Sequence, residues 1–227
     1  MKKPFLEIAA VVPMLVTLAI CAPSAHAQKF SEWSGHGSRE TIFTPIDFPD
    51  AILTGANGIS AGGKIVGAYD RADRTHHGFL LDGDFETIDF PDAATTFGFG
   101  INAQGDVTGD YADPDGRFHG FLWRGGQFTS IDFPGSVLTF GRGINRRCEI
   151  VGRYDDADGK SHAYLLRRGQ LSSIDFPDAL FTSANGINSR GDIVGSYTSV
   201  DGVSHGYLRS RGEEDDTQDD ECEDDEG

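Results

Sequence analysis

The chain has 227 residues, a formal net charge of −17 and three cysteines. This acidity argues against a nucleic-acid partner, because phosphate neutralisation needs clustered lysines and arginines. Only Cys148 and Cys222 lie beyond the N-terminal segment, too few for a disulfide framework, so a hydrophobic core must hold the fold together.

Residues 1–27 have the composition of a secretory signal peptide. Lys2 and Lys3 precede an apolar stretch over 8–20, which is shorter than the roughly 20 residues that span a bilayer. Small residues end this segment, so we expect cleavage after Ala27. Lipoprotein processing at Cys21 is an alternative, which the bulky residue before it disfavours. We therefore expect an exported protein, extracellular or periplasmic, with no membrane span.

After a lead-in over 28–41, one hexapeptide recurs through the chain. IDFPDA stands at 46–51, 88–93 and 174–179, and IDFPGS stands at 131–136. The regular spacing indicates four copies of one unit within a domain over 42–212.

Each unit contains four short β-type segments separated by turn signals. In the second unit the segments are FETIDF, TFGFGIN, DVTGDY and HGFLW. Glycines at the turns, such as Gly105 and Gly191, accept the positive φ of short connections, and the glycine content opposes helices. The unit is therefore predicted to be a four-stranded antiparallel meander.

The size of the unit predicts the architecture of the whole domain. Units of this length with four strands match propeller blades, which bury their faces against one another around an axis. No FxxIDF strand follows the fourth unit, whereas Ile42–Phe48 supplies one before the first. We therefore predict an all-β, four-bladed β-propeller, closed by pairing of Ile42–Phe48 with the strand around Tyr207. A β-solenoid, or a partial ring completed by dimerisation, is the alternative.

A second motif, GIN-x-x-G-x-IVG-x-Y, recurs in the units with small variations. It is followed by a strand that begins His77-Gly78-Phe79, His119-Gly120-Phe121, His162-Ala163-Tyr164 or His205-Gly206-Tyr207. These residues resemble the HAF repeat of bacterial extracellular proteins over about 42–212. The resemblance implies an exported repeat protein of propeller-like fold, and it supplies no activity and no catalytic residues.

The repeated histidines and aspartates admit either a metal site or a structural role. A feature present in every copy is most simply required by the copy, so we expect the four histidines to bond Asp47, Asp89, Asp132 and Asp175. Asp73, Asp115, Asp158 and Asp201 are expected to cap turns, because the spacing of a calcium loop is absent. We predict no metal, cofactor or catalytic residue.

Positions at which the units differ are better candidates for a specific site. The residue before the repeated Gly-Ile is Asn57, Phe99, Arg142 or Asn185, and the residue between Gly and Tyr of the third segment is Ala68, Asp110, Arg153 or Ser196. Gly-rich strands allow close backbone approach, so both positions are expected near the axis. Phe99, Asp110, Arg142 and Arg153 are therefore the predicted ligand-binding residues, suited to a polar or acidic ligand, a glycan or a protein. Drift at tolerant positions, with an Asp110–Arg153 ion pair, is the alternative.

Two further features concern the turns and the C-terminus. Cys148 replaces the turn glycine of the other units, so we expect a strained, exposed residue there and consider Cys222 as a disulfide partner. Residues 213–227 carry 11 acids and no base, which predicts a disordered tail.

The favoured function is an exported binding or scaffolding module of unknown ligand. An exported hydrolase or lyase on a propeller scaffold is the alternative, and a structural part of an envelope is a third reading. An enzyme should concentrate its histidines and carboxylates in one or two units, whereas most of them here recur in every unit.

Overall fold

The structure is a computed structural model and describes residues 41–212. The predicted signal peptide, the lead-in up to residue 40 and the acidic tail, with Cys222, lie outside the described residues. The described strands all fall within the compact unit that begins at Ile46. No helix within residues 41–212 could cross a membrane.

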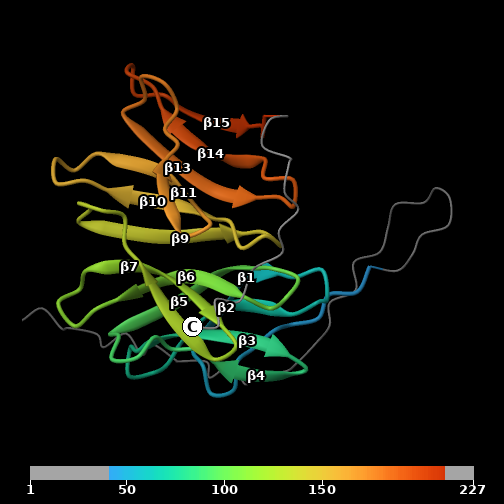
Figure 1. The fold of residues 1–227 in the computed structure, drawn as a ribbon. Coiled ribbons are helices and arrows are strands. Elements are labelled where there is room, and N and C mark those ends of the chain that lie inside the picture. Colours follow the sequence, from blue (N-terminus) through green and yellow to red (C-terminus); the bar gives the residue numbers. More distant parts are fainter. Residues whose placement is uncertain (1–40, 213–227) are drawn as a thin grey trace, which may run out of the picture. The chain divides into compact units, whose positions relative to one another are not determined.

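The described chain is all-β, as the repeat pattern predicts (Figure 1). Two mixed sheets of eight and seven strands make up the fold. The strands are β1 (Leu53–Ile59), β2 (Ile65–Asp70), β3 (His76–Asp82), β4 (Asp84–Thr87), β5 (Thr95–Ile101), β6 (Val107–Ala112), β7 (Phe118–Arg124), β8 (Gln127–Ile131), β9 (Leu138–Ile144), β10 (Ile150–Asp155), β11 (Ser161–Arg167), β12 (Gln170–Ser173), β13 (Phe181–Ile187), β14 (Ile193–Thr198) and β15 (Ser204–Arg209).

The sequence units fold as antiparallel meanders, which we call repeats 1 to 4. Repeat 1 contains β1–β4, repeat 2 contains β5–β8 and repeat 3 contains β9–β12. Repeat 4 has β13–β15 within the described residues. Single parallel pairs, His76 with Thr95 and Ser161 with Phe181, join repeats 1 and 2 into one sheet and repeats 3 and 4 into the other. The sequence did not predict this pairwise joining.

The strand predicted over Ile42–Phe48 does not form. Residues 41–48 have no regular secondary structure, and among the described strands β15 pairs with β14 alone. Phe48 instead packs on repeat 1, where its ring stacks on Tyr69 with centroids 3.7 Å apart and contacts Phe79. The Phe48 N–H is bonded to the Thr54 hydroxyl. The predicted pairing with the strand around Tyr207 is therefore not seen.

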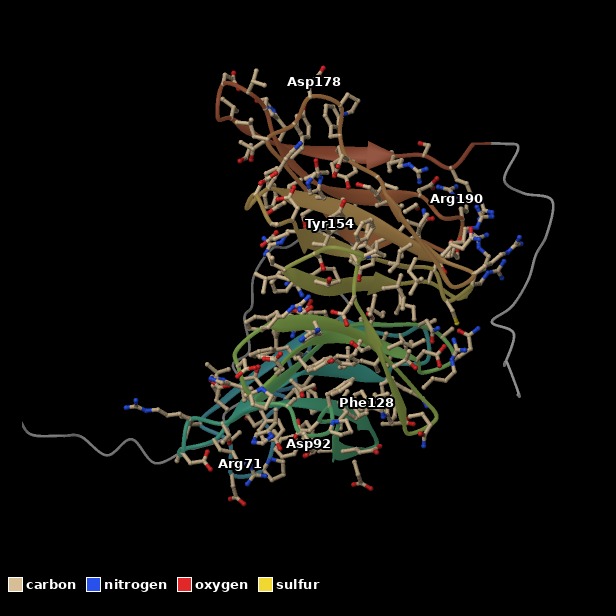
Figure 2. All side chains as sticks on the ribbon, turned by 60° about the vertical axis from the view of Figure 1, so that its left-hand side comes forward. Arg71, Asp92, Phe128, Tyr154, Asp178 and Arg190 are labelled. Atoms are coloured by element: carbon tan, nitrogen blue, oxygen red, sulfur yellow. The ribbon has the colours of Figure 1, made fainter. Side chains whose placement is uncertain are left out.

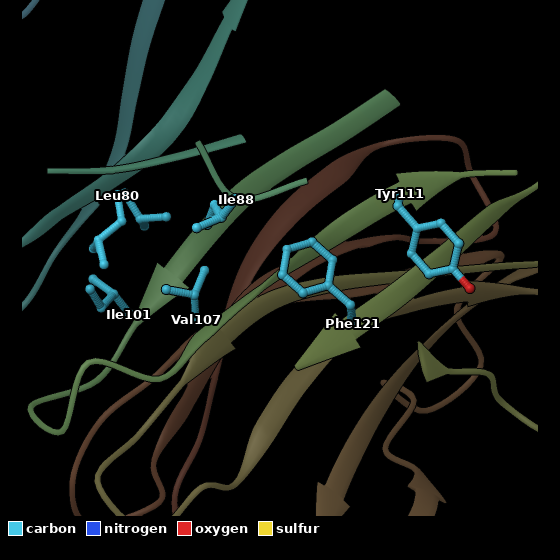
Figure 3. Close-up of a cluster of buried hydrophobic side chains, with 7 residues drawn as sticks. Leu80, Ile88, Ile101, Val107, Tyr111 and Phe121 are labelled. Atoms are coloured by element: carbon cyan, nitrogen blue, oxygen red, sulfur yellow. The ribbon is translucent and has the colours of Figure 1, made fainter. Parts of the chain in front are cut away.

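The hydrophobic core consists of clusters shared between neighbouring repeats. The first cluster combines Val66 and Leu80 of repeat 1 with Ile101, Val107 and Phe121 of repeat 2 (Figure 3). Two further clusters relate repeat 3 to repeats 2 and 4 in the same way. Each repeat thus covers the apolar face that the preceding repeat leaves open.

Glycines permit the first strands of successive repeats to approach closely. A Cβ at Gly58 would lie 2.5 Å from the Phe99 carbonyl oxygen, and one at Gly100 would lie 3.0 Å from the Arg142 carbonyl oxygen. Such contacts are too short for any side chain. The expectation that Gly-rich strands bring their variable residues together therefore has a direct structural basis.

Candidate functional site

A stack of three rings recurs in every repeat and explains why both motifs are constant. Phe90 stacks on Tyr111 with centroids 3.6 Å apart, and Tyr111 stacks on His119 at 4.9 Å. The equivalent stacks are Phe48–Tyr69–His77, Phe133–Tyr154–His162 and Phe176–Tyr197–His205. Sequence reasoning missed this stack, although the fixed spacing of Phe, Tyr and His was a signal of it.

The predicted His–Asp pairs form in three of four copies. Nδ1 of the histidine lies 2.7 Å from the carboxylate in His77–Asp89 and 2.6 Å away in His119–Asp132 and His162–Asp175. Burial lowers the pKa of His162, but hydrogen bonds to Asp175 and Asp156 outweigh burial and raise it. The structural role is confirmed in these copies. Within residues 41–212, no group of three or more metal-ligating side chains is found.

The predicted turn caps are correct in two repeats and wrong in two. Asp73 accepts the Thr75 N–H, and Asp201 accepts the Val203 N–H. In repeats 2 and 3, Asp113 and Asp156 cap the turns in place of Asp115 and Asp158, because the carboxylate two residues earlier reaches the backbone N–H groups. Backbone hydrogen bonds to these carboxylates accordingly lower the pKa of Asp113 and of Asp156.

Cys148 has the predicted backbone but not the predicted exposure. Its φ is 56°, whereas Gly105 and Gly191 have φ of 95° and 91° at the equivalent position. The residue is half-buried, and its sulfur lies 3.3 Å from an Asp106 carboxylate oxygen. Repeat 2 covers this turn, and this cover was not visible in the sequence.

The predicted ligand-binding residues lie close together, where repeats 2 and 3 meet. Arg142 donates to the Asp110 carboxylate at 2.5 Å, and its guanidinium lies 4.1 Å from the centre of the Phe99 ring. Arg153 does not bond Asp110. It lies 3.4 Å from the Asp155 carboxylate, so the ion pair considered from sequence is replaced by Asp110–Arg142.

Two further phenylalanines extend these contacts into a continuous series. Arg142 lies between Phe99 and Phe140, 5.3 Å from the latter ring, and Arg153 lies between Phe140 and Phe181, at 4.5 and 5.7 Å. We call Phe99, Arg142, Phe140, Arg153 and Phe181 the aromatic–arginine ladder. Sequence reasoning missed Phe140, although it stands two residues before Arg142 and therefore on the same face of β9.

Asp110 supports the ladder from inside the protein. Its side chain is 4% exposed and accepts the Gly141 N–H at 2.8 Å as well as the Arg142 guanidinium. Burial raises the pKa of Asp110 to about 6, although Arg142, the Gly141 N–H and Arg153 all act to lower it. Asp110 therefore fixes Arg142 and is not itself accessible to a ligand.

The ladder offers charge and flat apolar surface together. The side chains of Arg142 and Arg153 are 28% and 29% exposed. Repeats 1 and 4 have Asn57 and Asn185 in place of Arg142, so the feature is asymmetric. Guanidinium groups hold carboxylates or sulfates through two parallel hydrogen bonds, and phenylalanine rings stack on planar or sugar surfaces.

Comparison with known proteins gives likenesses of structure only. No protein-family model and no curated protein sequence matches the chain. A mutant of the Aleuria aurantia lectin in complex with alpha-methyl-L-fucoside is similar with a TM-score of 0.40 and 14% identity, over 66% of this chain and 54% of that one. A mutant of AofleA from Arthrobotrys oligospora is similar with a TM-score of 0.45 and 15% identity, over 78% of this chain and 60% of that one. At these values neither likeness indicates what this chain binds.

Proposed function

We propose that the protein is a binding module for an acidic ligand, with the aromatic–arginine ladder as its contact surface. The observation that carries this proposal is the alternation of two half-exposed arginines with three phenylalanines across repeats 2, 3 and 4. Such a surface suits an acidic sugar, whose carboxylate or sulfate meets a guanidinium while its ring face meets phenylalanine. Acidic oligosaccharides are therefore the first ligands to test.

The hydrolase or lyase alternative lacks support at this site. Asp110 is the carboxyl group nearest the ladder with a strongly raised pKa, a property that often marks a general acid. Its side chain is nevertheless buried behind Arg142 and committed to Arg142 and Gly141. A group that a substrate cannot reach does not transfer a proton to it, so the geometry favours binding.

Export, membership of the HAF-repeat family and a closed four-bladed propeller belong to the same proposal. The N-terminal composition supports export, and the two recurring motifs support the family. The uncovered ends of the described structure support closure. Ile59 is 69% exposed where Ile101 is 8% exposed, and Val194 is 50% exposed where Val66 is 0% exposed.

Polar groups at the two ends are complementary as well. In the described chain Asp47 has no histidine partner, and His205 bonds Ser199 where the other histidines bond a carboxylate. Pairing Asp47 with His205 would complete a fourth His–Asp pair, and packing Ile59 on Val194 would repeat the contact of Ile101 with Val66. This arrangement requires β1 to cover repeat 4, within one chain or between two.

Binding of acidic oligosaccharides by Arg153→Gln tests the ladder. Arg153 is the better target, because removing Arg142 would leave the buried Asp110 carboxylate unpaired. Uronate and sulfated oligosaccharides are titrated calorimetrically beside neutral oligosaccharides of the same length. We expect binding of an acidic series, weakened about 5- to 30-fold by Arg153→Gln, as loss of about 1–2 kcal/mol implies.

Arg71→Gln is the matched control, because Arg71 lies 5.5 Å from the centre of the Tyr69 ring and outside the ladder. This variant should bind like the unchanged protein. Equal losses in both variants would indicate a nonspecific charge effect, and no loss in either would place the contact surface elsewhere.

A further inference from the structure

Arginines gather at one end of repeats 3 and 4. The turns after β9, β11 and β13 and the residues after β15 all lie at the same end of their meanders. They carry Arg146, Arg147, Arg167, Arg168, Arg190 and Arg211, which we call the arginine patch. Figure 2 shows Arg190 at this end, among other side chains with nitrogen tips.

The carboxylates within the arginine patch are fewer than its arginines. Glu149 is buried and lies 3.1 Å from Arg147, 3.3 Å from Arg167 and 3.6 Å from Arg211. Asp192 lies 2.8 Å from Arg190. Within these turns, Glu149 and Asp192 are the acids, so the patch has a positive excess.

The equivalent end of repeats 1 and 2 is balanced. Lys64 pairs with Asp82 at 2.8 Å, and Arg124 pairs with Asp106 at 3.1 Å. The positive excess is therefore confined to repeats 3 and 4, the part of the fold from which the chain continues into its C-terminal segment. That segment, residues 213–227, carries 11 acids and begins two residues after Arg211.

We propose that the acidic segment 213–227 docks on the arginine patch of its own chain and is anchored by a Cys148–Cys222 disulfide. Charge complementarity selects this segment, because it is tethered directly beside the patch at high effective concentration. The proposal uses other residues than the aromatic–arginine ladder and stands apart from the proposed function. It also supplies a partner that the expectation of a disordered tail did not consider.

Cysteine positions support the same occupant. Cys148 lies between Arg147 and Glu149, inside the patch, and is disulfide-bonded. Cys21 falls in the predicted signal peptide, so Cys222 is the remaining candidate partner. Arg211 contacts Glu149, the residue next to Cys148, and the ten residues from Gly212 to Cys222 reach at most about 33 Å. The geometry of the tether therefore permits the bond.

Formation of the bond is an ordinary thiol–disulfide exchange. The Cys222 thiolate attacks a small disulfide, which releases one thiolate and leaves a mixed disulfide. The Cys148 thiolate then attacks the Cys222 sulfur and releases the second thiolate. The protein loses two electrons and two protons, and the oxidant becomes two thiols.

Peptide mapping and a redox equilibrium test the proposal on the full chain. Non-reducing digestion and mass spectrometry should recover a peptide pair joined through Cys148 and Cys222, and its absence would refute the anchor. The protein is then equilibrated with neutral bis(2-hydroxyethyl) disulfide and its thiol. The resulting effective concentration of the protein pair should fall at least about fivefold between roughly 20 mM and 500 mM salt, because salt screens docking.

Exposed arginines of the patch provide the variants. Arg146→Gln together with Arg168→Gln should lower this effective concentration about fivefold or more at low salt. Arg74→Gln, an exposed arginine of repeat 1, should not change it. An effective concentration that depends on neither salt nor the patch would show a disulfide without docking, and would overturn the electrostatic part of the proposal.

Discussion

Asp110 and Arg153 occupy equivalent positions in successive repeats and therefore face different neighbours. Each side chain at this position points toward the first strand of the following repeat. Asp110 thus meets Arg142 and Gly141 of β9, whereas Arg153 meets Phe181 of β13. Comparison of the sequence copies could identify both residues as unusual, but their partners depend on which repeat covers which.

The pKa of Asp110 predicts a pH dependence of stability. The folded value of about 6 lies above the ordinary value of 3.8, so between these pH values the folded carboxyl holds a proton that the unfolded one has released. The free energy of unfolding should therefore fall as pH rises through this window, by about 2–3 kcal/mol from this group. Asp110→Asn should lack this component.

Urea unfolding at several pH values measures the difference between the unchanged protein and Asp110→Asn. The difference should decline from pH of about 4 to about 6 and then remain level. Parallel curves for the two proteins would show that the Asp110 carboxyl is not raised by burial.

At the scale of strands, the constant residues of each unit serve the packing of one strand on the next. The ring of the HGF strand lies over the glycine of the IVG strand, and the Phe–Tyr–His stack covers the other side of the meander. These requirements explain why the units keep their motifs. They were predictable in part: strand order and turns follow from the sequence pattern, but ring-on-glycine contacts require the register, including the bulges between the first two strands of each repeat.

Glycine substitutions in repeat 2 test this packing. A Cβ at Gly109 would lie 1.9 Å from the Phe97 carbonyl oxygen and 2.9 Å from the Phe121 ring, so Gly109→Ala must displace backbone. We expect a loss of about 3 kcal/mol or more in the free energy of unfolding, measured by urea denaturation.

Gly120→Ala is the control on the adjoining strand. Its Cβ would lie 3.3 Å from the nearest atom, and repeat 3 has Ala163 at this position. A loss below about 1 kcal/mol is expected there. Equal losses in the two variants would contradict the ring-on-glycine account.

For the whole molecule, the two ends differ from the repeats between them. Middle repeats bury residues that the end repeats expose, because each apolar face is covered by the following repeat. The sequence predicted the repeats, but it could not establish closure. Neighbouring repeats make the same local contacts in a ring, an arc or a solenoid, and closure depends on the rotation accumulated over all repeats.

Val194→Glu tests whether the end of repeat 4 is covered in solution. If β1 covers it, a buried unpaired charge should cost about 2 kcal/mol or more in the free energy of unfolding. An open end should lose less than about 0.5 kcal/mol. Light scattering then distinguishes closure within one chain from closure between two.

Val200→Glu serves as the comparison, because Val200 lies in a turn and is 74% exposed. It should have little effect in either case. An effect at Val194 no larger than that at Val200 would contradict coverage of repeat 4 by β1.

The sharing of core clusters between neighbouring repeats has a consequence for synthesis. A chain that emerges from its N-terminus completes the first cluster only when Phe128 has emerged, the second with Leu171 and the third with Tyr207. Each newly made repeat covers the one before it and presents an apolar face of its own. A nascent chain therefore exposes one such face at every stage, and the position that a chaperone must protect moves along the chain with translation.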